Sequence, residues 1–307
     1  MSGAAAHITV PTWLTNTVTA AHGEEGRRWL ASLPDRAAAH LARWDLTLER
    51  VLDPGGSLSL ISYVHRDDLS PAVLKTGLPT PETAHEHTAL SHWAGRGAVL
   101  LLDADPAEGV LLLERLHGEI PLRSLAEPKA MLEATSLLHR LWVELPDPSP
   151  FPTLAARVEG TAARIAAQRP HPTATAAQPL ITEALDTAGS LVASATETVL
   201  LHGDFHHGNV LAADRAPWLA IAPRPLAGER AYDLARLALD RADTLIGSPG
   251  APSALRRRLH QLAGALDVDE DRLRGWTLFR AVDLALRALA AGRHEDAELH
   301  LELAGHL

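Results

Sequence analysis

A short polar segment between two apolar runs carries the residue types that could do chemistry. Residues 202–209 read His-Gly-Asp-Phe-His-His-Gly-Asn, with apolar residues 199–201 before them and residues 210–211 after them. Polar groups crowded between buried strands cost free energy, so such a segment is expected to serve a function. A carboxylate can orient or accept the proton of an attacking hydroxyl, and an amide oxygen can hold a Mg²⁺ ion that is bound to a nucleotide. Asp204 and Asn209 offer these two groups.

The spacing of this pair is informative. Asp204 and Asn209 are five residues apart. The same separation joins the catalytic-loop aspartate and the metal-binding asparagine of protein kinases, in the motif H-R-D-x-x-x-x-N. The spacing therefore indicates a catalytic loop of the kinase type.

A second interpretation of the same segment stays open. In an extended segment His202, Asp204 and His206 point to one face. Two imidazoles and a carboxylate on one face can bind zinc or iron, so a metallohydrolase is the alternative class. No second cluster of matching spacing supports it, because His85 and His87 fall on the surface of an expected helix.

The elements that must position these residues follow from hydrophobic periodicity. The first forty residues or so have a helical pattern. Alternation and short apolar runs then predict strands near residues 46–51, 58–63, 72–75, 98–102 and 110–113, with one helix near residues 86–93. A mostly antiparallel sheet with one helix fits this order.

The rest of the chain has mainly helical patterns. We expect helices near residues 131–142, 153–168, 178–194, 230–244, 252–264 and 270–292, with one non-helical island at residues 198–221. The fold class we predict is α+β with two lobes that share a cleft. The N-terminal lobe would take residues 1–115, and a mainly helical C-terminal lobe would take residues 116–307.

Composition narrows the class of function. The chain has 307 residues, with 38 acidic and 28 basic side chains and a formal charge of −10, which argues against a nucleic-acid binder and would suit a cationic small substrate. The absence of cysteine excludes disulfides and thiol nucleophiles. We find no signal peptide and no apolar run long enough to span a bilayer, so we expect a cytoplasmic protein without a membrane partner.

Several sequence blocks together resemble one family. The central blocks are H-G-D-x-H-x-G-N-V-L at residues 202–211, P-W-L-A-I at 217–221, P-x-P-L-x-G at 223–228 and A-Y-D-L-A at 231–235; weaker blocks are residues 72–75, 86–93, 111–116 and 276–286. From about residue 25 to residue 295 the chain resembles the aminoglycoside phosphotransferase family. It is most similar to the branch of streptomycin 6-kinases and hydroxyurea-type phosphotransferases.

The resemblance implies a protein-kinase-like fold and a nucleotide site in the N-terminal lobe. Lys75 would hold the α- and β-phosphates of ATP, and Glu86 would pair with Lys75. The hinge, Glu114 to Leu116, would bind adenine, with the cleft near residues 114–119. The turn that contains Gly56 and Ser57 would cover the phosphates, although it is not a G-x-G-x-x-G loop.

The resemblance also assigns roles in the C-terminal lobe. Asp204 would be the catalytic base and Asn209 a Mg²⁺ ligand. His202 and Asp233 would support the catalytic loop structurally. Apart from the resemblance, we expect acidic side chains of the C-terminal helices, with Asp283 as the candidate, to hold an ammonium or guanidinium group of the substrate.

One departure from the family pattern bears on activity. Family members carry A-I-D-P-x-P after the catalytic loop, and that aspartate is their principal Mg²⁺ ligand. This chain has Ala222 at the position of the aspartate. A methyl group cannot bind Mg²⁺, so we expect a lower rate of phosphoryl transfer unless another acid supplies the ligand.

These observations lead to one expected function and to one alternative function on the same scaffold. We expect ATP-dependent phosphorylation of a hydroxyl on a small cationic molecule, an aminoglycoside antibiotic such as streptomycin, with Mg²⁺ and without an obligate protein partner. The alternative on the same scaffold is a catalytically degenerate protein that binds nucleotide or antibiotic without transferring phosphate, which would explain Ala222.

Overall fold

The chain folds into two compact units. The computed structural model describes residues 8–167, 172–245 and 250–307. The first unit extends as far as Gly118 and also takes in Ala212–Pro217, and the second consists of Glu119–Leu211 and Trp218–Leu307.

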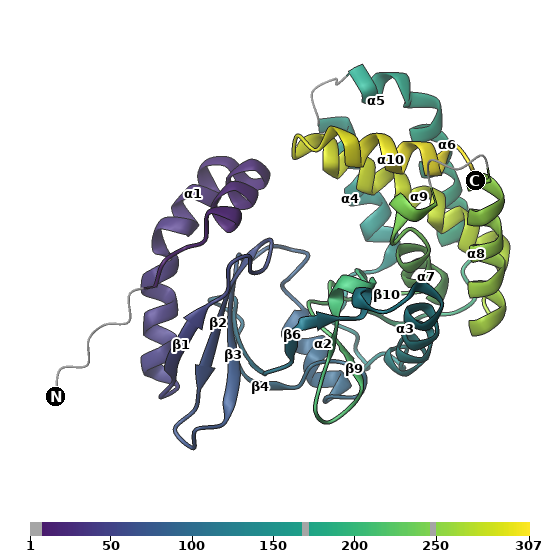
Figure 1. Ribbon diagram of the computed structural model, residues 1–307. Coiled ribbons are helices and arrows are strands. Elements are labelled where there is room, and N and C mark those ends of the chain that lie inside the picture. Colours follow the sequence, from purple (N-terminus) through teal and green to yellow (C-terminus); the bar gives the residue numbers. More distant parts are fainter. Residues whose placement is uncertain (1–7, 168–171, 246–249) are drawn as a thin grey trace. The chain divides into compact units, whose positions relative to one another are not determined.

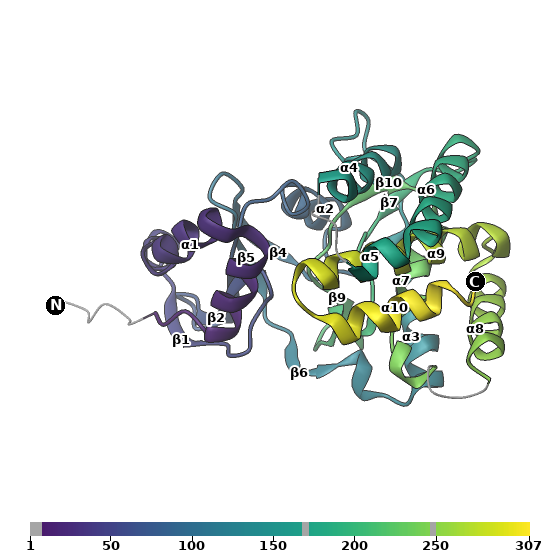
Figure 2. The same cartoon turned by 90° about the horizontal axis from the view of Figure 1, so that it is seen from above.

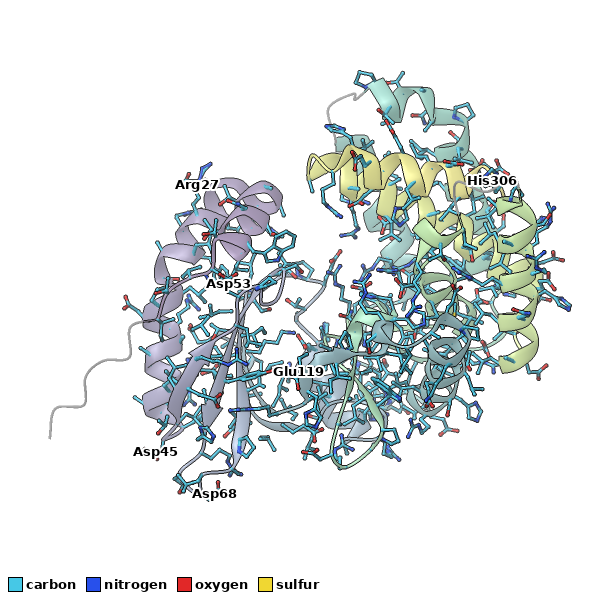
Figure 3. All side chains as sticks on the ribbon, viewed as in Figure 1. Arg27, Asp45, Asp53, Asp68, Glu119 and His306 are labelled. Atoms are coloured by element: carbon cyan, nitrogen blue, oxygen red, sulfur yellow. The ribbon has the colours of Figure 1, made fainter. Side chains whose placement is uncertain are left out.

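The first unit is built on a five-stranded antiparallel sheet (Figure 1). Its strands lie in the order β1-β2-β3-β5-β4, with bounds β1 Thr47–Val51, β2 Ser59–His65, β3 Pro71–Gly77, β5 Val110–Glu114 and β4 Leu101–Asp105. The connection that contains Asp53 and the connection that contains Asp68 lie at opposite ends of this sheet (Figure 3). The β1–β2 connection is therefore at the end where β3 finishes, since Ser59 pairs with Gly77.

One long helix, α1 Thr12–Arg43, covers one face of the sheet. Its apolar residues, among them Leu14, Val18 and Leu33, form one core with Leu60 of β2 and Leu74 of β3. The helix is interrupted at Gly23, whose φ of 52° and ψ of −125° are not helical. This apolar stripe of α1 packs against every second residue of the strands. The residues between them therefore face away from α1.

The second helix of this unit, α2 Glu86–Trp93, has the predicted amphipathic spacing. Glu86, Ala89, Leu90 and Trp93 are all buried. A carboxylate on a buried helix face needs a partner, which is described below.

The second unit is mainly helical. Its helices are α3 Glu127–Leu141, α4 Leu154–Ala167, α5 Pro172–Ala176, α6 Gln178–Ala193, α7 Arg230–Ala238, α8 Ala251–Leu266, α9 Glu270–Ala290 and α10 His294–Ala304. Helix α9 packs against α6, α7, α8 and α10, and the run of α10 along α9 can be followed in Figure 2. Among the helices of the described residues, none combines the length and the apolar character needed to cross a membrane.

Short strands hold the polar segment between these helices. β7 Val199–Leu201 pairs antiparallel with β10 Leu226–Gly228, and a three-stranded sheet has the order β6-β8-β9. The bounds of its strands are β6 His117–Pro121, β8 Val210–Ala212 and β9 Trp218–Ala220. The α+β class predicted from the sequence pattern is confirmed.

Some element bounds differ from the prediction. The strand expected at residues 98–102 begins only at Leu101, because side chains bind part of this run: Arg215 donates to the carbonyl of Ala98 and Glu114 accepts from the N–H of Leu100. The helix expected at residues 230–244 ends at Ala238, shortly before Arg241 adopts a φ of 54°. Strand β6 and the helices α5 and α10 were not predicted.

Candidate active site

In the first unit, a lysine on β3 meets a glutamate on α2. Ala72, Leu74 and Thr76 face the buried side of β3, so alternation leaves Lys75 on the other side. Its ammonium lies 2.6 and 2.7 Å from the two carboxylate oxygens of Glu86. The Lys75 side chain is 12% exposed and that of Glu86 5%, so both side chains of the pair are mostly buried.

The turn expected to cover phosphates lies at the same end of the sheet as Lys75. Gly56 and Ser57 belong to the connection between β1 and β2. A Cβ on Gly56 would lie 3.0 Å from the carbonyl oxygen of Ser59 and 3.6 Å from the side chain of Ile61, which pairs with Lys75 in the sheet. The backbone therefore passes close to β2 here, and a side chain at this position would need the strand to shift.

The expected hinge residues lie at the other end of β3, since Glu114 pairs with Ala72. The carboxylate of Glu114 accepts from the Leu100 N–H at 2.6 Å and from Arg215 at 2.7–3.0 Å, and Leu116 is buried. Arg215 also donates to the carbonyls of Gly95 and Ala98. Sequence reasoning missed Arg215, because a single arginine in a polar loop has no distinguishing signal.

In the second unit, the backbone of the catalytic segment makes a tight turn directly after β7. Gly203 has a φ of 78°, and a Cβ at this position would lie 1.9 Å from the carbonyl oxygen of Arg224. Only glycine avoids both the left-handed strain and this clash. The N–H of Arg224 in turn donates to the carbonyl of His202 at 2.8 Å, which holds the two stretches together.

Asp233 of α7 fixes the start of the segment. Its fully buried carboxylate accepts the backbone N–H groups of His202 and Gly203, both at 2.7 Å, and the indole N–H of Trp142 at 3.2 Å. Burial raises the pKa of Asp233 to about 6, against the lowering effect of these donors. His202 is fixed too, with Nε2 3.0 Å from the carbonyl of Ile221 and Nδ1 accepting the N–H of Asp204 at 3.3 Å.

A second carboxylate fixes the middle of the segment, and sequence reasoning missed it. Asp240 accepts the backbone N–H of His207 at 2.8 Å and lies 2.6 Å from its Nδ1. His207 is fully buried. A lone aspartate inside the helix expected at residues 230–244 gives no local signal of this contact. Two anchors from one helical region therefore hold the backbone on both sides of Asp204.

Three guanidinium groups surround the carboxylate of Asp204. The nearest nitrogen–oxygen distances are 3.2 Å to Arg236, 3.5 Å to Arg224 and 3.7 Å to Arg280. Burial raises the pKa of Asp204, but the neighbouring positive charges, that of Arg224 first, outweigh burial and hold the pKa well below its usual range. Asp204 is therefore ionised at neutral pH, and it suits orienting a hydroxyl better than removing its proton.

The residues near Asp204 do not fit a tightly held divalent cation. The carboxamide nitrogen of Asn209 donates to the carbonyl of Asp204 at 2.9 Å, which leaves the amide oxygen as its coordinating atom. Ala222 offers a methyl group, although its φ of 54° belongs to a region that Asp, Asn and Gly adopt more readily than Ala. The carboxylate of Asp204 itself forms ion pairs with three arginines.

The imidazoles of His202 and His206 form hydrogen bonds with backbone groups nearby. His202 contacts Ile221 and Asp204 as described, and Nδ1 of His206 accepts the N–H of Gly208 at 3.1 Å. Within residues 8–167, 172–245 and 250–307, no three His, Asp or Glu side chains are gathered so that they could hold a metal ion. The geometry gives the metallohydrolase alternative no support.

Asp283, the residue expected to hold a cationic group of the substrate, has arginine partners of its own. Asp283 on α9 is buried, forms an ion pair with Arg164 and accepts from Arg287 at 3.0 Å. These guanidinium groups lie where a cationic substrate group was expected.

Comparisons with known proteins identify the family of this chain. The model of the family described as aminoglycoside/hydroxyurea antibiotic resistance kinase matches residues 43–292. A streptomycin 6-kinase of Streptomyces glaucescens is 36% identical over 282 residues, which cover 91% of this chain and 90% of that protein. A hydroxyurea phosphotransferase of Kitasatospora aureofaciens is 36% identical, covering 96% and 83% of the two chains.

Among solved structures, the chain is similar to an aminoglycoside phosphotransferase, APH(4)-Ia. The TM-score is 0.61 at 17% identity, covering 88% of this chain and 96% of the other, which supports the kinase-like fold. The predicted family and fold are confirmed. The chain belongs to the aminoglycoside/hydroxyurea antibiotic resistance kinase family, whose named relatives are phosphotransferases.

Proposed function

We propose that this protein phosphorylates a hydroxyl group of an aminoglycoside antibiotic such as streptomycin, with ATP as the donor. The observation that carries the proposal is the anchoring of Asp204 by Asp233 and Asp240, in a chain 36% identical to a streptomycin 6-kinase. Such rigid placement is what phosphoryl transfer needs, because its catalysis is mostly positioning and charge stabilisation. Since ATP is the donor, the proposal includes a cytoplasmic location.

Each unit contributes its own residues to the proposed reaction. Lys75, held by Glu86, binds the α- and β-phosphates, and the Gly56–Ser57 turn covers them. The backbone after Glu114, at Leu116, binds the adenine.

The proposed transfer is a single in-line displacement. The acceptor oxygen forms a bond to the γ-phosphorus while the bond from that phosphorus to the bridging oxygen breaks, and ADP leaves. Asp204 accepts a hydrogen bond from the attacking hydroxyl and aligns it. Because the pKa of Asp204 is lowered, the proton leaves late and passes to a phosphate oxygen or to water. Among the residues that the structure describes, those near Asn209 do not make a fitting set of ligands for the Mg²⁺ ion expected there, so alignment of the hydroxyl depends on Asp204.

The direct test measures release of ADP with ATP, Mg²⁺ and streptomycin, together with the mass of the antibiotic product. The wild-type chain should release ADP in a streptomycin-dependent way and form a phosphorylated antibiotic. The variant Asp204→Asn should lose nearly all of this activity, because an amide cannot align the hydroxyl as a carboxylate does. Streptomycin-dependent release that is equal in both proteins would contradict the assignment of Asp204.

Ala222 favours a second candidate on the same scaffold, a protein that binds nucleotide or antibiotic without transferring phosphate. It predicts saturable binding of ATP or streptomycin in calorimetry with no ADP release at any antibiotic concentration. The same pair of measurements therefore separates the two candidates.

A further inference from the structure

Helix α7 and the residues just after it contact the catalytic segment at three successive places. The carboxylate of Asp233 fixes the backbone before Asp204, and that of Asp240 fixes the backbone after it. Arg236 lies between these two anchors, one turn after Asp233, and contacts the side chain of Asp204. The two acids hold the backbone of the segment, whereas Arg236 acts on the carboxylate itself.

The guanidinium of Arg236 is committed to Asp204. Its side chain is 15% exposed, and its Nε donates to Oδ1 of Asp204 at 3.2 Å. In the described part of the chain, this is the only hydrogen bond that the guanidinium makes. Arg280 lies 3.7 Å from the same oxygen, which is beyond hydrogen-bond distance, and donates to the hydroxyl of Tyr232. One donor therefore holds Oδ1.

The two oxygens of the Asp204 carboxylate have different surroundings. Oδ1 accepts from Arg236, whereas Oδ2 accepts no hydrogen bond from any residue that the structure describes. Nε of Arg224 lies 3.5 Å from Oδ2, as an ion pair and not as a hydrogen bond. A carboxylate that aligns a hydroxyl must offer it an oxygen within hydrogen-bond reach. Oδ2 is the oxygen that can do so.

Anchoring of the backbone does not by itself decide where these oxygens point. The terminal torsion of aspartate is broad, so a carboxylate on a fixed backbone can still turn. We infer that Arg236 is a positioning residue whose Nε–H holds Oδ1 of Asp204 and so presents Oδ2 to the hydroxyl that is phosphorylated. The inference rests on the proposed function, because that function gives Asp204 the hydroxyl to align. Misplacement of a reacting group is costly in a reaction whose catalysis is mostly positioning.

The donor and the charge of Arg236 can be separated by substitution. In Arg236→Gln the amide nitrogen stands the same number of bonds from the backbone as Nε of arginine, so a donor stays while the charge is lost. Arg236→Lys keeps the charge but has a methylene group at that position. Arg236→Met removes both the donor and the charge.

The first measurement is kcat and KM for streptomycin-dependent ADP release. Arg236→Lys and Arg236→Met should lower kcat at least about tenfold, the value of one hydrogen bond to a charged group, and Arg236→Gln should lower it less. KM for ATP and for streptomycin should stay close to the wild-type values, because Arg236 acts through Asp204. A role in stability alone would not place the glutamine variant above the lysine variant. Arg257→Met, at an exposed position on α8, is the matched control and should keep the wild-type kcat.

The second measurement does not need activity. Urea unfolding of Arg236→Met, Asp204→Ala and the double variant forms a double-mutant cycle. The shifts of the unfolding midpoint should not add, because each substitution removes the same contact. If Arg236→Met folds poorly, Arg236→Lys takes its place in the cycle, since it also removes the Nε donor.

Two outcomes overturn the inference: a kcat of Arg236→Lys equal to or above that of Arg236→Gln, or additive shifts in the cycle. A wild-type chain that releases no ADP with streptomycin would contradict the proposed function, and the cycle would then decide whether Arg236 holds Asp204. Streptomycin-dependent ADP release together with additive shifts would contradict this inference alone.

Discussion

Lys75 of β3 donates to both carboxylate oxygens of Glu86 at the start of α2, at 2.6 and 2.7 Å. A strand and a helix thus present one ammonium group in a fixed direction. Both side chains are mostly buried, so few other orientations of the ammonium group are open to it. This is the arrangement that a phosphate-binding lysine requires.

The first prediction concerns that lysine. Lys75→Met keeps the length of the side chain but removes the charge, so we expect nucleotide affinity to fall at least about tenfold, one charged contact being worth 1.4 kcal/mol or more. Calorimetric titration with ATP measures the change. The chain has one other lysine, Lys129, which lies exposed on α3, and Lys129→Met should bind ATP as wild type does. Equal affinities in the two variants would show that Lys75 does not bind nucleotide.

A second prediction concerns the missing carboxylate. We expect Ala222→Asp to raise the rate of ADP release with ATP, Mg²⁺ and streptomycin at least about tenfold, because stabilisation of charge by a metal ion is worth several kcal/mol. The backbone should accept the change, since the φ of 54° at this position suits aspartate better than alanine. Ala222→Asn, which gains the shape of the side chain without its charge, is the matched control. Equal rates in all three proteins would mean that position 222 is not a ligand position.

The third prediction concerns pH. Burial, helped by the charge of Arg236, lowers the pKa of His206 to about 3 in the folded chain, from 6.5 in the unfolded chain. Between these values the unfolded chain binds a proton that the folded chain does not bind. The stability that neutral His206 contributes is therefore present above pH 6.5 and is lost as the pH falls through this window, with a slope of up to about 1.4 kcal/mol per pH unit.

Urea unfolding between pH 7 and pH 5 tests this, with His206→Asn as the comparison. Asparagine does not titrate and can still cap the short turn at Gly208, as Nδ1 of His206 does. The difference in stability between wild type and His206→Asn should change with pH in favour of the variant at low pH. His139→Asn, at an exposed position on α3, should leave the pH dependence unchanged. A parallel pH profile for wild type and His206→Asn would contradict the prediction.

The fourth prediction concerns the turn after β7. Gly203→Ala should destabilise the protein by more than about 2 kcal/mol and abolish ADP release, because the new Cβ would meet the carbonyl of Arg224 at 1.9 Å in a left-handed conformation. Gly160→Ala is the same substitution in helix α4, where no atom lies within 4 Å of the new Cβ, and it should stabilise by about 0.5–1 kcal/mol. Thermal melting of both variants measures the contrast. Similar melting temperatures would show that the turn tolerates a side chain.

Much of the fold could be predicted because its signals are local. The alternation of β2 and β3 and the buried face of α2 follow from period-two and helical spacing within a few residues. The strand expected at residues 98–102 was placed wrongly for a reason that is not local. Its backbone is partly bound by the side chains of Glu114 and Arg215, which a pattern of apolar residues does not reveal.

The sequence by itself determined the family, the α+β class and the polar segment that carries Asp204 and Asn209, because these depend on residue types at short, fixed spacings. Only the tertiary structure decided the electrostatic setting of Asp204. Arg236 comes from α7 and Arg280 from α9, and the anchor Asp240 follows α7, so their contacts depend on how helices far apart in the chain pack. The charge that a buried carboxylate experiences is a sum over neighbours in space, and spacing along the chain does not contain that sum.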